Sequence, residues 1–440
     1  MNEYPYWWDT LPSGQGAGIS TPHRPGRAGQ LPVNVPPLPA RADVVVVGAG
    51  YTGLAAARHL AHSGASVLVI ERETIGWGAS SRNGGQVLTG MKLDPGTLVA
   101  RFGEARAREL FEIANASIAR LEALVATEAI DCEFERVGHI QLAWKPAHFA
   151  AFRDEQSLLA RVFAHRVELI SSGSHRAEIG SDRYHGVMVD ERSGAINPAR
   201  YVSGLAGAAT RCGATIAEGV AVNAVDRGGD RWRVATTAGV VEAANVLFAT
   251  NGYTNGAFPD LKRRFLPIGS YIIATEPLEA SQAQALLPRR RMAFDSKNFL
   301  YYFRVTPDRR LLFGGRAEFG RPGPDTTRRA AAILREGMAD VFPELRGTAI
   351  EYGWGGNVAF TRDQMPRAGL LGGLFYAGGY CGHGVAMATY LGEQIGRRMA
   401  GEAIDHPLFD DRFPAIPGYS GSPWFLPLVG AYYQLMDWIQ

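Results

Sequence analysis

The sequence of 440 residues predicts an α/β fold, with a discontinuous Rossmann-like dinucleotide-binding domain and an antiparallel β-sheet substrate domain of α+β type. Three observations predict it. Residues 44–70 read as strand, helix and strand, and residues 262–318 are rich in strand patterns. Of the 53 glycines, nine lie between Gly48 and Gly90 and ten between Gly353 and Gly384. Because glycine inside apolar segments lets a backbone approach something closely, we expect both windows to line one binding site.

The βαβ unit opens with a continuous apolar strand at Val44–Val47. A helical pattern follows at Thr52–Ser63, with Gly64 as its stop signal, and Ser66–Ile70 reads as a second buried strand. A glycine fingerprint indicates dinucleotide binding when it lies in such a unit of strand, tight turn, helix and strand.

The turn carries that fingerprint, Gly48-x-Gly50-x-x-Gly53. Gly48 permits the tight turn, Gly50 lets the backbone approach a pyrophosphate, and Gly53 lets the helix pack against the sheet. The helix N-terminus offers free N–H groups and the positive end of its dipole to phosphates. Glu71, which ends the second strand, would accept hydrogen bonds from an adenosine ribose. The chain holds one such fingerprint, which disfavours enzymes that bind two dinucleotides in separate Rossmann domains.

Two further glycine-rich segments complete the predicted site. The loop Ile75–Gln86 consists mostly of small residues, as a chain needs beside a long, flat cofactor. In the second window, a strand at Leu374–Ala377 ends in Gly378-Gly379, and a helix starts near His383. This arrangement aims a second helix N-terminus at a negative group.

The remaining pattern predicts elements on both sides of these windows. Helices are expected as two in residues 97–131 and at Tyr201–Cys212, Asp325–Val341, His383–Ala400 and, on the surface, Trp424–Ile439. Strands are expected as a hairpin in Phe134–Trp144 and at Ala214–Ala217, Arg231–Thr236, Asn245–Ala249, Ile268–Thr275, Phe299–Val305 and Arg310–Phe313.

These elements predict four units. Residues 1–40 form a Pro-rich N-terminal arm whose aromatic side chains pack on the domain surface, with a lid or interface role as the alternative. The dinucleotide-binding domain combines residues 41–92, 196–260 and 351–400, and the substrate domain combines 93–195 and 261–350. Residues 401–440 form a C-terminal tail with the surface helix.

Composition excludes several classes of protein. The 45 basic and 43 acidic residues give a net charge of +2, which argues against nucleic acid as a partner. Cys132, Cys212 and Cys381 are widely separated, which disfavours disulfide scaffolds and metal sites and fits a reducing cytoplasm. No segment has the roughly 18 uninterrupted apolar residues of a membrane span, and no signal peptide is expected.

Several of these motifs together resemble the D-amino-acid oxidase/glycine oxidase (DAO) superfamily of FAD enzymes, and within it the gamma-glutamylputrescine oxidase-like branch. The resemblance extends over nearly the whole chain. It is carried by GAGYTGL at 48–54, IGWGASSRNGGQ at 75–86, ATNGYTN at 249–255, LLFGG at 311–315, GHG at 382–384 and the GAYYQLMDW tail.

The resemblance implies FAD and assigns it residues. The pyrophosphate would lie on Gly48–Gly53, the ribose on Glu71, the adenine on the backbone of Val222, and the flavin along the 75–86 loop and the second window. The implied FAD-binding set is Gly48, Gly50, Tyr51, Thr52, Gly53, Glu71, Arg72, Gly78, Ala79, Ser80, Ser81, Arg82, Asn83, Gly84, Gly85, Gln86, Val222, Thr250, Asn251, Gly252, Gly379, Gly382, His383 and Gly384.

The sequence departs from sarcosine-oxidase-like relatives at two points. Those relatives attach FAD through a cysteine near the stretch that corresponds to Gly355–Gly356, where this chain has none, so noncovalent FAD is expected. They also carry an oxygen-activating lysine where this chain has Leu311 and Leu312, which leaves O2 or another electron acceptor open.

The resemblance implies that a neutral amine passes hydride to flavin N5 and that the resulting imine is hydrolysed, with O2 reduced to H2O2. The alternatives are an amine or D-amino-acid dehydrogenase that passes electrons to a quinone, and an FAD-dependent tRNA-modifying protein. The expected substrate contacts and catalytic residues are His383, Tyr302, Arg304, Arg316, Trp354 and Asn357. Aromatic residues would form a wall for the amine, and an Arg would bind a substrate carboxylate. The sequence leaves the amine and the oligomeric state undetermined.

Overall fold

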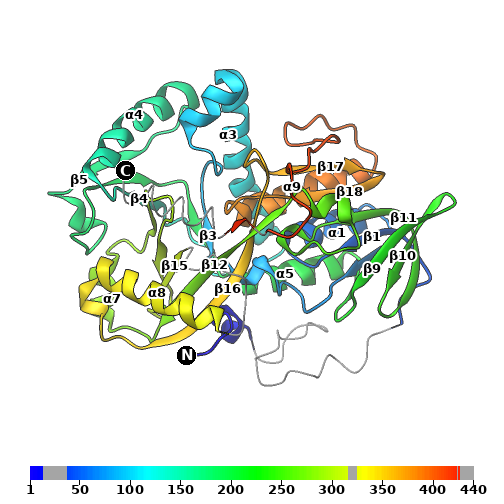
Figure 1. Cartoon of the computed structure of the whole chain (residues 1–440), viewed down its shortest axis with the longest axis horizontal. Helices are drawn as coiled ribbons and strands as arrows, with labels where there is room; N and C mark the ends of the chain where they lie inside the picture. The colour runs from blue at the N-terminus through cyan, green and yellow to red at the C-terminus, as the bar shows by residue number, and fades with distance from the viewer. Residues whose placement is uncertain (13–36, 316–324, 424, 427–440) are drawn as a thin grey trace.

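The computed structural model describes residues 1–12, 37–315, 325–423 and 425–426, and these residues form two large sheets with helices around them (Figure 1). The expected fold class is confirmed, because one sheet has a parallel core and the other is largely antiparallel. Within the described residues, no helix has both the length and the apolar character that a membrane crossing requires.

The first sheet has the strand order β17-β18-β11-β1-β2-β8, and the hairpin of β9 and β10 extends from β11. β1 is parallel to β11 and β2, and β11 is parallel to β18, so strands distant in the sequence become neighbours. The bounds are Arg41–Val47 (β1), Val67–Ile70 (β2), Thr215–Ala217 (β8), Val222–Gly228 (β9), Arg231–Thr236 (β10), Gly239–Phe248 (β11), Arg367–Leu371 (β17) and Leu374–Gly378 (β18).

Helices α1 (Tyr51–His62), α5 (Pro198–Arg211) and α9 (Gly384–Met399) pack on one face of this sheet. Glycines let α1 approach its neighbours. A Cβ at Gly53 would lie 2.0 Å from the Gly48 carbonyl oxygen, and one at Gly392 of α9 would lie 2.3 Å from the Thr52 oxygen. Backbone contact of this kind fixes the start of α1 against the middle of α9.

The second sheet has the order β16-β12-β15-β14-β13-β4-β6-β5, and its one parallel pair is β13 with β4. The bounds are His139–Leu142 (β4), Glu168–Ser171 (β5), Gly186–Asp190 (β6), Leu266–Thr275 (β12), Met292–Asp295 (β13), Tyr302–Val305 (β14), Leu311–Gly315 (β15) and Ile350–Phe360 (β16). A separate two-stranded sheet joins β3 (Gln86–Val87) to β7 (Gly194–Ala195).

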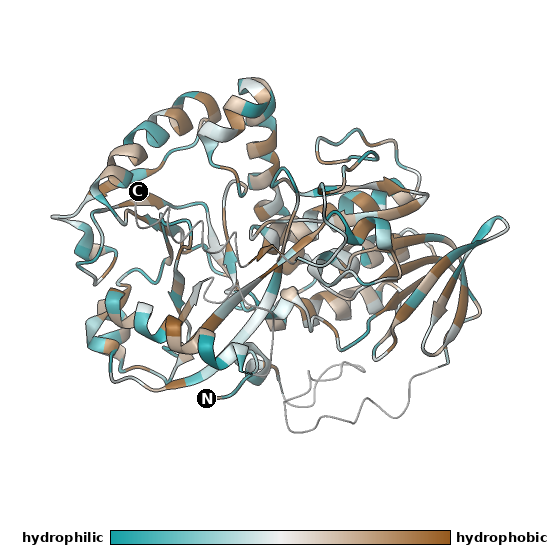
Figure 2. Ribbon diagram, viewed as in Figure 1, coloured by the Kyte–Doolittle hydropathy of each residue, from teal (hydrophilic) through white to brown (hydrophobic). Residues whose placement is uncertain are grey.

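Further helices complete the structure. They are α3 (Pro95–Thr127), α4 (Pro146–Phe163), α7 (Ala280–Leu286) and α8 (Thr326–Val341), and short helical turns lie at η1 (Tyr6–Thr10), α2 (Ala79–Arg82), η2 (His175–Ala177), η3 (Asn251–Tyr253), α6 (Pro259–Lys262) and η4 (Pro343–Leu345). Figure 2 shows polar and apolar residues alternating along α3 and α4, as expected for helices with one face on a core.

Some local predictions differ from the structure. The hairpin expected in Phe134–Trp144 is wrong, because its one named strand, β4, pairs with β6 and β13 instead. Residues 351–360, expected in the dinucleotide-binding domain, lie in β16, which pairs with β12 of the second sheet. By contrast, the two helices expected in 97–131 are present: the span labelled α3 consists of two helices that meet at a kink at Gly103, whose φ is +74°. The Trp424–Ile439 helix lies almost entirely outside the described residues.

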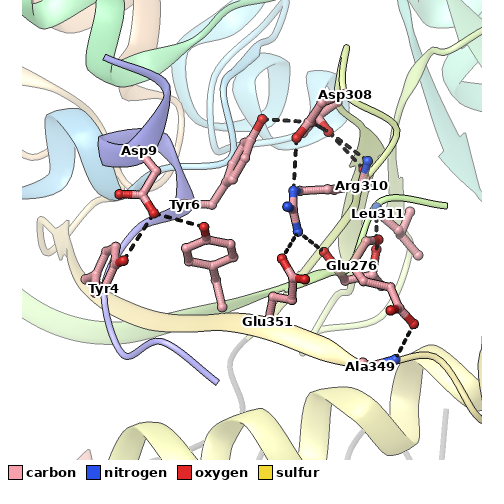
Figure 3. Close-up of polar contacts among 12 residues, drawn as sticks. Tyr4, Tyr6, Asp9, Glu276, Asp308, Arg310, Leu311, Ala349 and Glu351 are labelled. Atoms are coloured by element: carbon pink, nitrogen blue, oxygen red, sulfur yellow. Dashed lines mark hydrogen bonds and ion pairs between the residues drawn. The ribbon is translucent and has the colours of Figure 1, made fainter. Parts of the chain in front are cut away.

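The described part of the N-terminal arm packs its aromatic side chains on the domains, as expected. Tyr6, Trp7 and Trp8 are buried. Figure 3 shows how the segment is held to the second sheet. Tyr6 Oη donates to Asp308 Oδ1 at 2.7 Å, and Asp9 Oδ2 accepts from Tyr352 Oη of β16 at 2.9 Å.

Candidate functional site

A long cavity, here called the first cavity, lies at the starts of α1 and α9. It is bounded by the 76–83 loop and by the segments that follow β8 and β11. Most residues of the expected FAD-binding set line it: Gly48, Gly50, Tyr51, Thr52, Glu71, Arg72, Gly78, Ala79, Ser80, Asn83, Val222, Thr250, Asn251, Gly382 and Gly384. Five separate segments of the chain thus meet at one elongated space.

The glycine fingerprint has the geometry expected of it. Gly48 has φ +106°, and a Cβ at Gly50 would lie 2.8 Å from Ser80 Oγ, so side chains are excluded at both positions. Ser80 Oγ accepts a hydrogen bond from the Tyr51 N–H at 3.0 Å, which holds the 76–83 loop against the start of α1. The backbone is therefore bare where a phosphate would approach the helix.

Glu71 lines the first cavity beside the glycine fingerprint. Its Oε2 accepts the Ala49 N–H at 2.9 Å, and its Oε1 accepts the Glu73 N–H at 2.9 Å. Burial raises the pKa of Glu71, while these two backbone bonds act to lower it. Each carboxylate oxygen keeps a second lone pair for a hydroxyl donor, so the residue is fixed and still able to bind.

Polar groups of several loops meet at the α9 end of the first cavity. The Gly379 N–H donates to Asn251 Oδ1 at 2.9 Å, and Asn357 Nδ2 donates to the Gly252 oxygen at 3.3 Å. Cys381 lines the cavity, and burial raises the pKa of its thiol to about 11. At neutral pH this thiol is therefore protonated and a poor nucleophile.

Some residues of the expected set support the first cavity without lining it. Gly53, Ser81, Gly85, Gly252 and Gly379 lie behind its wall. Ser81 Oγ donates to the Gly76 oxygen at 2.7 Å, and a Cβ at Gly85 would lie 2.2 Å from the Ile196 oxygen. These residues shape the loop and do not face the space.

A second cavity, of about 460 Å³, lies between the two sheets and adjoins the first. Ala79, Asn83, Asn357, Val358, Cys381, Gly382 and Val385 line both cavities. The volume suits a small molecule. The expected residues Arg82, Gly84, Gln86, Tyr302 and His383 face this second cavity.

His383 precedes α9 and lines the second cavity. Burial, together with the positive charge of Lys92, lowers its pKa to about 3, so the ring is neutral at physiological pH. Tyr302 shares a hydrogen bond with Ser270 Oγ at 3.0 Å on the opposite side. The structure brings these two residues and Asn357 to one cavity, as expected.

Arg304 and Trp354 lie elsewhere. Arg304 Nη1 donates to the Gly85 and Ile196 oxygens at 3.0 and 2.9 Å, and its burial lowers its pKa to about 10. Trp354 is 1% exposed, and its Nε1 donates to the Arg82 oxygen at 2.9 Å. Neither lines the first or the second cavity, and both side chains donate to backbone oxygens of the 82–85 segment. Arg316 lies outside the described residues.

Sequence reasoning missed several charged residues of the second cavity, among them Lys92, Glu155, Asp295 and Lys297. It assigned no role to His139 and His165, which also line this cavity. One signal was available, because the chain has only 4 lysines and two of them are here. His139, Asp295 and Glu155 come from β4, β13 and α4, and these elements meet only through long-range strand pairing.

The residues of the first cavity fit a dinucleotide. Its bare glycine turn, two helix starts and fixed carboxylate match the phosphate, flavin and ribose sites that the fingerprint requires.

Comparison with known proteins agrees with this fit. Residues 43–398 match the family model DAO, FAD dependent oxidoreductase. The chain is 33% identical to gamma-glutamylputrescine oxidoreductase of Escherichia coli K12 over 399 residues, which are 90% of this chain and 92% of that protein. It is 32% identical to the probable oxidoreductase OrdL of Rhizobium meliloti, over 90% of this chain and 92% of that one.

Solved structures share the fold. Glycine oxidase from Geobacillus kaustophilus superposes with a TM-score of 0.72 at 20% identity, over 86% of this chain and 99% of that one. Iminodiacetate oxidase from Chelativorans sp. BNC1 superposes with a TM-score of 0.67 at 20% identity, over 84% and 98%. The family expected from the sequence is confirmed: the chain belongs to the DAO family of FAD-dependent oxidoreductases.

Proposed function

We propose that the protein oxidises a C–N bond of a small amine or amino-acid-like substrate with noncovalently bound FAD. The observation that carries the proposal is the shared wall of the two cavities, formed by residues such as Asn357 and Gly382. A substrate in the second cavity would lie next to one end of a cofactor in the first. The E. coli relative bears the name of an oxidoreductase of gamma-glutamylputrescine, an amine.

In this proposal FAD lies along the first cavity, with its pyrophosphate at Gly48–Gly53, its ribose at Glu71 and its adenine at Val222. The ring end lies at the start of α9, whose dipole stabilises negative charge. When bound, FAD supplies the acceptor for a hydride from the carbon beside nitrogen. The substrate nitrogen loses a proton, an imine forms, and water converts the imine to a carbonyl product and an amine.

The surroundings of the ring end favour a neutral amine. His383 stays uncharged there and therefore adds no positive charge to those of Arg82 and Lys92. Arg82 and Lys92 line the same part of the second cavity and disfavour a protonated amine beside them. Tyr302 and Asn357 contribute an aromatic wall and a hydrogen-bonding amide for orientation.

The electron acceptor stays open between O2 and a quinone. Leu311 and Leu312, at the position of the lysine in sarcosine-oxidase-like relatives, are buried in β15 and do not line either cavity. Hydrogen peroxide released during turnover supports the oxidase. Turnover that requires a quinone or dye and releases no peroxide would favour the dehydrogenase.

The proposal is tested by anaerobic bleaching of the flavin absorbance. The panel holds N-methyl amino acids, gamma-glutamyl amines, polyamines and D-amino acids. We expect at least one amine to reduce the flavin with saturation kinetics. If none does so in protein with a full complement of FAD, the proposed function is wrong.

A further inference from the structure

Glu155 is the acidic residue of the second cavity whose charge nothing nearby compensates. It lies on α4 and lines the cavity. Within the described part of the chain, no donor lies within hydrogen-bond or ion-pair distance of its carboxylate. Burial raises its pKa to about 7, and the negative charge of Asp94 adds to the effect. A half-buried carboxylate without a partner favours a cation beside it.

The other carboxylates that line the second cavity, among the residues described, already have partners. Asp190 Oδ2 bonds to His165 Nε2 at 2.7 Å and accepts from Thr89 Oγ1 at 2.6 Å. Asp295 lies 3.4 Å from Lys297 Nζ. Asp94 caps α3, where it accepts the Thr97 N–H at 2.8 Å. Glu155 therefore differs from these three acids.

The opposite end of the cavity, beside the first cavity, is positive. Lys92 contributes to the low pKa of His383 there. Arg82 donates to the Trp77 and Gly355 oxygens at 2.7 and 3.0 Å, and no carboxylate of the described residues lies within ion-pair distance of it. An amino group tends to lose its proton at this end and to keep it beside Glu155.

The segment that contains Lys92 and Asp94 connects the two ends along the cavity wall. Two residues of extended chain span roughly 7 Å at most. Apolar side chains line part of the cavity, namely Leu159, one turn after Glu155 on α4, and Phe111, Val167 and Met188. A short alkyl chain fits between these features, with one amino group at each end.

We propose that Glu155 binds a second, protonated amino group of the substrate, remote from the C–N bond that is oxidised. The substrate class is then amines that carry such a second ammonium group. The inference rests on the proposed function, because the positive end of the cavity serves as the site of oxidation. It goes further by assigning a residue and a charge to the remote end.

The test compares Glu155→Gln with the wild-type holoenzyme and with Asp154→Asn. Asp154 is the exposed neighbour on the same helix, so its variant controls for the loss of one acid from α4. The probes are α,ω-diamines of four to eight carbons and n-alkylamines of the same lengths. Dissociation constants come from anaerobic flavin reduction and, independently of turnover, from calorimetry.

We expect Glu155→Gln to weaken diamine binding by roughly 10-fold to 100-fold, the range for one hydrogen bond to a charged group. Alkylamine binding should change by less than about twofold, since these probes have no second ammonium. Asp154→Asn should leave both series as in the wild type. Glu155→Asp, which keeps the charge, should recover part of the diamine affinity.

Equal losses for diamines and alkylamines in Glu155→Gln would overturn the inference, as would wild-type protein that binds diamines no better than alkylamines. FAD content and melting temperature, measured on each variant, identify a misfolded one, and Glu155→Asp then provides the comparison. If diamines bind with a Glu155-dependent preference but no amine reduces the flavin, the proposed function fails and the cation site stands.

Discussion

The N-terminal segment makes two hydrogen bonds to the loop that borders the first cavity. Trp7 Nε1 donates to the Asn83 oxygen at 2.9 Å, and Trp8 Nε1 donates to Ser81 Oγ at 2.8 Å. Asn83 lines the first cavity, as does Ser80, the residue before Ser81. The double variant Trp7→Phe/Trp8→Phe keeps aromatic rings at both positions and removes both donors. We therefore predict that it weakens FAD binding.

The magnitude follows from these two bonds. A lost hydrogen bond costs about 1 kcal/mol net, and more where the acceptor stays buried. Two bonds correspond to about 2 kcal/mol, and each 1.4 kcal/mol is a factor of ten in an equilibrium constant. If the loss of both bonds destabilises by this free energy the conformation of the 76–83 loop that binds FAD, the Kd for FAD rises roughly 30-fold.

The assay is titration of apoprotein with FAD, followed by quenching of flavin fluorescence. The control is Tyr352→Phe, which removes a bond to Asp9 of the same segment but none of the hydrogen bonds of the 76–83 loop. We expect the control to bind FAD as the wild type does. If the double variant shows the lowered melting temperature of a destabilised fold but the FAD affinity of the control, the segment stabilises the fold alone and the reasoning is refuted.

Three further predictions follow from the site. Gly53→Ala should yield insoluble or FAD-free protein, because its Cβ would lie 2.0 Å from the Gly48 oxygen. The control Gly207→Ala in α5 meets only the flexible end of Arg211, at 3.4 Å, and should yield soluble holoprotein. Soluble, FAD-replete Gly53→Ala would contradict the packing argument. Acid precipitation should release all flavin into the supernatant, because the Cys381 thiol is protonated; flavin in the pellet would contradict noncovalent binding. The unfolded His383 ring takes up a proton near pH 6.5 but the folded ring only near pH 3, so the stability of the apoprotein should fall as pH falls through that range. Urea unfolding at pH 7.5 and 5 should show a smaller fall for His383→Gln, and an equal fall would exclude this residue as a cause.

The first cavity followed from the sequence because its determinants are local. Gly48, Gly50 and Gly53 lie within six residues, and Glu71 ends the next strand, so one βαβ unit fixes their geometry. The second window needed only a strand, a turn and a helix start.

The second cavity could not be predicted from the sequence, because its residues meet through strand pairings that local sequence patterns do not encode. The four-residue strand β4 pairs with β6 and with β13, which both come much later in the sequence, and α4 begins after Lys145 without a side-chain cap. Arg304 illustrates a further limit. Its strand was predicted, but which backbone oxygens would surround the guanidinium depends on the 82–85 segment and on Ile196.

The close contact of α1 with α9 has a consequence for synthesis of the protein. Residues 41–62 form β1 and α1, but part of the first cavity is lined by the segment after β18 and by the start of α9, from Tyr380 to Ala388. A nascent chain that has made only the fingerprint therefore has half of a cofactor site. With FAD in the first cavity as proposed, we expect the cofactor to bind only after the segment that precedes α9 has been made and has met the start of α1.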